Sequence, residues 1–229
     1  MDEDIKLLVA TPCGRGQVEA GYTHSCLQLQ SNFLAKQWEI SFSFISGCLI
    51  HRLRNEFVFH FLNSEYTHIL FVDSDIQFDP EVVTRMLSLN KEVIGGICPY
   101  KKYIKGQLSY NVVPKSEAVE LATHNEAQAL EVEKIGTGFL LMKREVFELI
   151  KPHATKVIYN SSSEEGGEKN VTPLSMFSFF DFPIDEDGVE HGEDFSFCEK
   201  LNKAGVKIWA MHPQYDRFIH WGLHAYGGQ

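Results

Sequence analysis

The sequence has no run of eighteen apolar residues, which is about the shortest length of a membrane-spanning helix. Its first residues, Met1-Asp2-Glu3-Asp4, are acidic and lead directly into a β-leaning segment, so no classical signal peptide is indicated. We therefore expect a protein with no membrane span and a cytoplasmic location.

Cysteine is scarce, and its pattern argues against two further classes of protein. The chain has five cysteines, an odd number, and no Cys-x-x-Cys pair. This pattern disfavours a disulfide scaffold and a zinc site, and favours buried, reduced thiols. The five are Cys13, Cys26, Cys48, Cys98 and Cys198.

Basic residues are outnumbered by acidic ones, 21 to 31, which gives a formal charge of −10. Nucleic-acid-binding proteins usually show a basic face, so nucleic acid is not an expected partner. A phosphate-bearing small substrate stays compatible with this charge, because a divalent cation can bridge an acidic protein and an acidic ligand. Neither a Gly-x-Gly-x-x-Gly fingerprint nor a Walker spacing occurs, so neither a dinucleotide site nor a P-loop is indicated.

Strand and helix patterns alternate three times in the first half of the chain, which predicts a parallel sheet with helices on its faces. The helix from Pro80 is expected to begin with Asp79 as its N-cap. The predicted pairs are strand Ile5–Thr11 with helix Tyr22–Lys36, strand Ile40–Phe44 with helix Ile50–Leu62, and strand Ile69–Val72 with helix Pro80–Asn90, followed by strand Val93–Cys98.

The pattern loosens after Tyr100, where short strands and two helices are expected. Ser161–Lys169 is polar and of low complexity, and predicts a surface loop or a lid. The sequence therefore predicts an α/β protein with a Rossmann-like front half and a mixed back half in one domain, residues 1–229. The back-half elements are strands Leu108–Val113, Leu130–Lys134, Phe139–Met142, Val206–Met211 and Arg217–His220, helix Arg144–Ile150, and a helix that begins at Glu193 and is capped by Gly205.

The most informative segment is the apolar strand Ile69–Val72, which runs straight into Asp73-Ser74-Asp75. Two carboxylates at the carboxyl end of a buried strand lie where ligands bind in open α/β sheets. Such hard oxygen ligands suit Mg²⁺ or Mn²⁺ held together with substrate phosphates. A turn or helix-cap role is the alternative. The similar Asp185-Glu186-Asp187 lies in a Gly-punctuated acidic stretch and predicts a loop.

Two other motifs carry candidate functional groups. Glu193-Asp194 opens a helix, where carboxylates are also favoured simply by the helix dipole. His220 ends a predicted strand and suits a metal ligand, with His212 and His224 as competitors.

Gly136-Thr137-Gly138 would let the backbone approach a ligand closely and present a hydroxyl group to it. A tight turn or bulge before the following strand explains these residues equally well.

In this combination and order the motifs resemble the GT-A-fold, metal-dependent glycosyltransferases that use nucleotide-diphosphate sugars, of the family-2 type. The matching pieces span nearly the whole chain. They are Thr11-Pro12, Arg54-Asn55, Asp73-Ser74-Asp75, Gly136-Thr137-Gly138, Glu193-Asp194 and His220-Trp221-Gly222.

The resemblance implies a role for each piece. Mn²⁺ or Mg²⁺ would be held by Asp73, Asp75 and His220, and Asp194, with Glu193 beside it, would be the base of an inverting transfer. The nucleotide-sugar would contact Thr11, Pro12, Arg15, Arg54, Asn55, Asp73, Ser74, Gly136, Thr137 and Gly138.

The resemblance also implies a division of the chain. Residues 1–100 would bind the donor, a UDP- or GDP-sugar carrying a hexosyl or deoxyhexosyl group. Residues 101–229 would bind a glycan, glycoprotein or glycolipid acceptor, with Asp181, Phe182 and Ser161–Lys169 as contacts. The residues by themselves leave two simpler interpretations open. Arg54 and Asn55 could lie on an exposed helix face, and Arg15 could lie in a solvated loop.

Two other functions stay open at this point. A nucleotidyltransferase shares this type of sheet but would be expected to carry a Gly-rich, basic loop after its first strand, where this chain has only Cys13–Gly16. A non-catalytic nucleotide- or carbohydrate-binding module would keep the fold without turnover.

Overall fold

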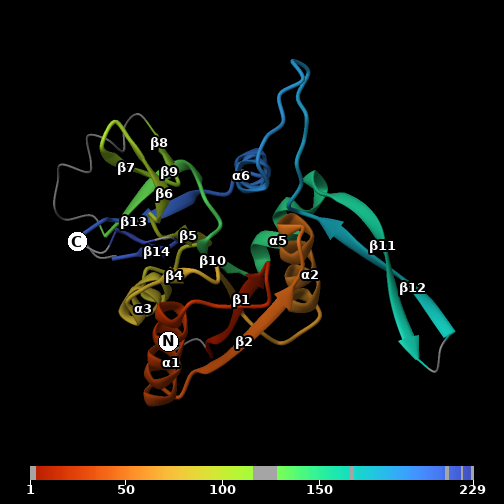
Figure 1. Cartoon of the computed structure of the whole chain (residues 1–229), viewed down its shortest axis with the longest axis horizontal. Helices are drawn as coiled ribbons and strands as arrows, with labels where there is room; N and C mark the ends of the chain where they lie inside the picture. The colour runs from red at the N-terminus through yellow and green to blue at the C-terminus, as the bar shows by residue number, and fades with distance from the viewer. Residues whose placement is uncertain (1–3, 116–127, 166–167, 215–216, 223, 228–229) are drawn as a thin grey trace.

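The computed structural model describes residues 4–115, 128–165, 168–214, 217–222 and 224–227. Its centre is an eight-stranded mixed sheet (Figure 1). The strands lie in the order β2 (Glu39–Ser46), β1 (Lys6–Cys13), β3 (His68–Val72), β10 (Phe139–Lys143), β5 (Val93–Gly95), β13 (Ile208–Met211), β9 (Ala129–Ile135) and β8 (Val112–Pro114).

The sheet is parallel in two places only. Strands β2, β1 and β3 are parallel to one another, as are β5 and β13. Strand β10 enters antiparallel between β3 and β5, so the fourth predicted strand, β5, does not pair with the third, β3. The front half is thus Rossmann-like and the whole sheet is mixed, as predicted.

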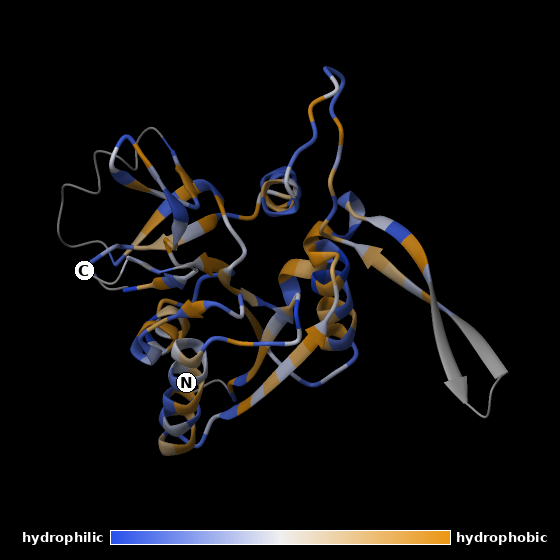
Figure 2. Ribbon diagram, in the orientation of Figure 1, coloured by the Kyte–Doolittle hydropathy of each residue, from blue (hydrophilic) through white to orange (hydrophobic). Residues whose placement is uncertain are grey.

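Helices cover both faces of the sheet because side chains alternate along the buried strands. Leu7 and Val9 of β1 pack with helices α1 (Ala20–Ala35) and α3 (Pro80–Ser88) on one face. Leu8 and Ala10 pack on the other face with α2 (Ile50–Leu62), α5 (Glu145–Ile150) and α6 (Glu193–Lys203). Figure 2 shows the hydrophobic colouring concentrated in the central strands between these helices.

Local signals placed several helix ends correctly. Helix α2 has the predicted bounds, and α3 begins at Pro80 with the Asp79 carboxylate accepting a hydrogen bond from the Glu81 backbone N–H. Helix α6 begins at Glu193 and is followed by Gly205 at φ +74°, a conformation that glycine adopts without strain. None of the helices in the described residues is both long and apolar enough to cross a membrane.

The prediction of a loop at Ser161–Lys169 is wrong for the residues that the structure describes. They belong to a long antiparallel hairpin of β11 (Thr155–Glu165) and β12 (Glu168–Ser178), which projects from the body of the molecule beside α2 (Figure 1). The segment is polar, so it shows no hydrophobic alternation, yet cross-strand pairing satisfies its backbone.

Three other predicted strands differ from the structure. Val93–Cys98 ends at Gly95, and the next residue, Gly96, lies against the Phe218 ring, where a Cβ atom would come 2.2 Å from it. Leu108–Val113 is divided between two sheets as β7 (Gln107–Tyr110) and β8, and β7 pairs with an unpredicted strand, β6 (Pro99–Ile104). The last predicted strand becomes β14 (Ile219–Trp221), in a small sheet with β4 (Ile76–Gln77) and β15 (Ala225–Gly227). A short 3-10 helix, η1 (Lys151–His153), follows α5.

Candidate active site

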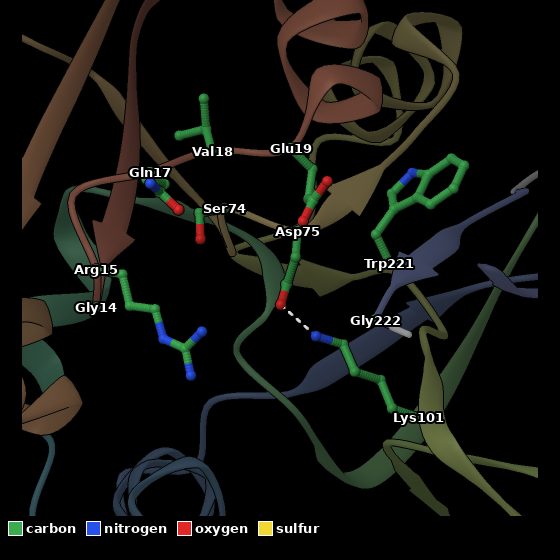
Figure 3. A pocket seen from close by; sticks show the side chains of 10 residues that line it. All are labelled: Gly14, Arg15, Gln17, Val18, Glu19, Ser74, Asp75, Lys101, Trp221 and Gly222. Atoms are coloured by element: carbon green, nitrogen blue, oxygen red, sulfur yellow. Dashed lines mark hydrogen bonds and ion pairs between the residues drawn. The ribbon is translucent and has the colours of Figure 1, made fainter. Parts of the chain in front are cut away.

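A cavity of about 830 Å³ opens at the carboxyl ends of β1 and β3. The chain leaves β1 toward β2 on one side and returns to β3 on the other, which makes this edge a topological switch point, where α/β sheets bind ligands. The cavity is lined by Gly14, Arg15, Gln17, Val18, Glu19, Ser74, Asp75, Lys101, Trp221 and Gly222 (Figure 3).

Backbone hydrogen bonds from three separate segments hold the Asp73-Ser74-Asp75 turn in place. The Asp73 N–H donates to the Gly138 carbonyl, and the carbonyls of Ser74 and Asp75 accept from the N–H groups of Glu19 and Trp221, all at 2.9 Å. The carboxylates of this turn are therefore fixed by the loop after β1, by the turn before β10 and by β14.

The Asp75 carboxylate is held by two groups. Oδ2 accepts from Lys101 Nζ at 2.5 Å, and Oδ1 lies 3.3 Å from His220 Nε2. Burial works to raise the pKa of Asp75, but the hydrogen bonds from His220 and Lys101 outweigh it and lower the pKa below its ordinary value. The side chain is therefore a carboxylate at neutral pH.

His220 is oriented by a backbone carbonyl. Its Nδ1 lies 2.8 Å from the Pro99 oxygen, which can only accept, so Nδ1 donates to that oxygen and Nε2 faces Asp75. Of the competing histidines, His212 is buried and its Nδ1 accepts from the Gln214 N–H, while His224 is exposed with its ring against Tyr226.

Asp75 and His220 suit a divalent cation that takes its other ligands from a bound phosphate. Oδ1 of Asp73, the third predicted ligand, accepts from Arg54 at 3.2 Å, and its role as a metal ligand stays a prediction. In the described part of the chain, no group of three or more His, Cys, Asp or Glu side chains is arranged to hold a metal ion. With two protein ligands, Mg²⁺ or Mn²⁺ would complete its coordination with water or substrate oxygens.

Arg54 joins the two acidic motifs. Its guanidinium is buried, and besides Asp73 it donates to Glu193 Oε1 at 2.5 Å and Asp194 Oδ1 at 2.9 Å. The exposed helix face considered for Arg54 is thus wrong. Its planar fork suits this bridging role, which a lysine could not fill in the same way.

Asp194 is also held from the turn before β10. Its Oδ1 accepts from the Thr137 hydroxyl at 2.9 Å, and its Oδ2 from the Thr137 N–H at 3.3 Å. A Cβ at Gly138 would lie 2.9 Å from Asp73 Oδ2, and one at Gly136 would lie 2.8 Å from the Asn111 amide. This turn therefore approaches protein side chains and positions both acidic motifs, and its contact with the nucleotide-sugar stays a prediction.

Asn55 lies away from the cavity. It is buried, its Oδ1 accepts from the N–H groups of Phe179 and Phe180, and its Nδ2 donates to Ser178 and to the Phe180 carbonyl. Because these bonds use the whole amide, Asn55 ties α2 to the segment after β12, and we omit it from the nucleotide site.

Thr11 and Pro12 are also buried, near the end of β1, and neither lines the cavity. The Thr11 hydroxyl is 2.6 Å from the Tyr22 hydroxyl. Both residues shape the start of the loop that carries Arg15, whose guanidinium points into the cavity (Figure 3).

Of the back-half candidates, Asp181 contacts α6 and Phe182 contacts α2. Asp181 accepts hydrogen bonds from Ser196 and from Lys200, and Phe182 is 41% exposed with its ring near His51. Asp185-Glu186-Asp187 forms a turn, as predicted, in which Asp185 Oδ1 accepts from the N–H groups of Asp187 and Val189.

Sequence reasoning missed Lys101. It lies on β6, which was not predicted, and its partner Asp75 is 26 positions earlier in the chain. Only the approach of β6 to β14 in space brings the two together. Trp221 was noticed only as part of the His220 motif, yet it lines the cavity, and its indole N–H donates to Gln77.

The acidic cluster raises the pKa values of two of its members. Burial raises the pKa of Glu193 to about 7, with the Asp194 carboxylate adding to the rise and Arg54 opposing it. Burial also raises the pKa of Asp73, again against Arg54. One guanidinium does not neutralise three carboxylates, so the cluster holds a proton more strongly than free side chains would.

We expect this proton to make folding stability depend on pH. Glu193 has a pKa of about 7 when folded against an ordinary 4.5, so between these values the folded state binds more protons and stability falls as pH rises. The full effect is roughly 3 kcal/mol. Urea unfolding should show that the free energy of unfolding falls less between pH 5 and pH 8 for Glu193→Gln than for wild type.

The exposed Glu186 provides the matched control, since Glu186→Gln should keep the wild-type loss of stability between pH 5 and pH 8. Equal losses in wild type and Glu193→Gln would mean that Glu193 does not hold this proton.

No protein-family model and no curated protein matches the sequence. Among solved structures, the chain is similar to A197 from STIV, at 18% identity and a TM-score of 0.51 over 95% of this chain and 86% of that one. This similarity confirms the predicted α/β, GT-A-like fold.

Two further structures resemble the chain less closely. One is UDP-glucose pyrophosphorylase complexed with UDP-glucose, at 9% identity and a TM-score of 0.47, covering 90% of each chain. The other is S. aureus TarS 1-349, at 14% identity and a TM-score of 0.46, covering 91% of this chain and 58% of that one.

Proposed function

We propose that this chain is a glycosyltransferase that moves a sugar from a UDP- or GDP-sugar to a hydroxyl group of a glycan, glycoprotein or glycolipid. One observation carries the proposal: the cavity that ends at Asp75 lies next to a carboxylate, Asp194, that Arg54 links to Asp73 of the same turn. A donor site and a candidate base therefore share one edge of the sheet.

The cavity offers groups for the donor diphosphate. Arg15 and Lys101 supply positive charge, and Ser74 supplies a hydroxyl group. Asp75 and His220 would hold Mn²⁺ or Mg²⁺, which when bound would neutralise the charge that develops on the departing nucleoside diphosphate.

Asp194 supplies the base in this proposal. It would remove the proton from the acceptor hydroxyl as that oxygen bonds to the anomeric carbon and the bond from this carbon to the diphosphate oxygen breaks. This single displacement inverts the anomeric centre. The Asp194 side chain is 32% exposed and that of Glu193 is 15% exposed, so Asp194 is the more accessible of the two. Thr137 and Arg54 hold its position.

A nucleotidyltransferase on the same fold is the second candidate, and the two reactions release different products. A glycosyltransferase releases a nucleoside diphosphate from a nucleotide-sugar. A nucleotidyltransferase joins a nucleoside triphosphate to a sugar phosphate and releases pyrophosphate from the triphosphate. Incubating the protein with each substrate set and assaying both products separates the two functions.

Donor binding can be tested first by thermal shift with UDP, GDP, CDP and TDP, with and without Mn²⁺. A nucleotide present at a hundred times its dissociation constant should stabilise the protein by about 2.7 kcal/mol. We expect this shift with one nucleotide, dependent on Mn²⁺, and lost in Asp75→Ala. Asp187→Ala, an exposed carboxylate of the turn at 185–189, should keep it. The absence of a shift with every nucleotide would contradict the assignment of the cavity as the donor site.

A further inference from the structure

Lys101 occupies the place next to Asp75 that a divalent cation would take. Its Nζ is 2.5 Å from Asp75 Oδ2, while His220 Nε2 is 3.3 Å from the other oxygen. The ammonium group and a cation would thus both bind the same carboxylate, at the end of the cavity where the diphosphate is proposed to lie.

The path of the Lys101 side chain is shaped by its neighbours. Lys101 and Pro99 both lie on β6, and the Pro99 carbonyl orients His220, so one strand positions both partners of Asp75. The stem of Lys101 crosses Gly222, where a Cβ atom would lie 3.1 Å from its Cδ. The side chain is still 35% exposed, so its ammonium group has room to move.

The charges in the cavity show how the Lys101–Asp75 ion pair would affect the binding of a diphosphate. The lining residues include the acids Asp75 and Glu19 and the bases Arg15 and Lys101. With no divalent cation present, Lys101 neutralises Asp75, which would otherwise repel a diphosphate. Once a cation neutralises Asp75, the ammonium group is free to bind phosphate oxygens.

We propose that Lys101 is the resident counter-cation of Asp75, that a divalent cation displaces it there, and that the released ammonium group then binds the donor diphosphate. This inference rests on the proposed function, because the diphosphate is the ligand that Lys101 turns to. Lys101 thereby orders the two binding events, with the cation preparing the site for the nucleotide.

The proposal predicts opposite effects of Lys101→Met on the two ligands. Removing a competing, partly exposed ion pair should tighten the binding of Mn²⁺ alone by about fivefold. Removing a charge-assisted hydrogen bond should weaken UDP or GDP binding at saturating Mn²⁺ by about tenfold. A side chain with a merely structural role would not move the two affinities in opposite directions.

The experiment measures Mn²⁺ affinity from the electron paramagnetic resonance signal of the free ion, and nucleotide affinity by calorimetry. Lys102→Met is the matched control, since it removes the same charge from the same strand and Lys102 Nζ lies over the Tyr100 ring instead. Gly222→Ala is a second test, because its methyl group would crowd the Lys101 stem while leaving the charge in place.

We expect Lys101→Met and Gly222→Ala to tighten Mn²⁺ binding and Lys102→Met to leave it unchanged. Equal Mn²⁺ affinity in wild type and Lys101→Met would overturn the displacement, whether or not nucleotides bind. If Mn²⁺ binding responds as expected but neither UDP nor GDP binds any variant, the proposed donor site fails while the competition for Asp75 stands.

Discussion

Asp194→Asn is expected to lower the rate of sugar transfer by about 10²–10⁴-fold, the contribution of a positioned general base. Asparagine keeps the size of the side chain and one oxygen that can accept from Thr137, but it cannot accept the acceptor's proton. Because Asp194 is not among the residues that line the cavity, nucleotide affinity should change little. The measurement is the initial rate of nucleoside diphosphate release with the donor identified by the nucleotide panel.

Glu193→Gln is the matched comparison for this prediction, since it removes the neighbouring carboxylate from the same helix start. If Asp194 is the base, Glu193→Gln keeps most of the rate. A rate in Asp194→Asn above a tenth of the wild-type value would rule out this residue as the base. A large loss in Glu193→Gln alone would transfer the role to Glu193.

Arg54→Met is expected to destabilise the fold by about 3–5 kcal/mol, the cost of leaving a buried charge without its partner. Three carboxylates, those of Asp73, Glu193 and Asp194, would lose their shared counter-charge. Arg54→Lys should recover only part of the loss, because a single ammonium group cannot reach all three as the guanidinium fork does. Urea unfolding at pH 7 measures the effect.

The loss of the Arg54 charge should also change how the stability of the protein depends on pH. Without Arg54 the carboxylates bind protons more strongly when folded, so the variant should lose stability as pH rises and approach wild type in mild acid. Arg52→Met provides the control: Arg52 lies on the same helix with its guanidinium over the Tyr159 ring, a contact worth about 0.5–1 kcal/mol. A cost below 1 kcal/mol for Arg54→Met would show that the cluster does not depend on this cation.

Much of the secondary structure was predictable because its signals are local. Helix α2 matched its predicted bounds, and Asp79-Pro80 placed the start of α3. The hairpins β6–β7 and β11–β12 were not predicted as such. Their strands are short or polar, so the pairing partner rather than the hydrophobic pattern of one strand defines them.

The candidate site was likewise predictable from the sequence only in part. The acidic motifs at 73–75 and 193–194 could be recognised from sequence, because each stands at the end of a strand or the start of a helix. Their roles could not be told apart, since whether a carboxylate is free or engaged depends on its neighbours. Arg54 engages Asp73, and this leaves Asp75, with His220, as the carboxylate that faces the cavity.

The sequence by itself determined the α/β class, the alternation of strands and helices in the front half, and the acidic motifs. Only the tertiary structure decided which groups meet. Arg54 reaches Glu193 across 139 positions of the chain, and β6 brings Lys101 to Asp75. Such contacts depend on the packing of whole elements on a shared core, whereas spacing along the chain reports only near neighbours.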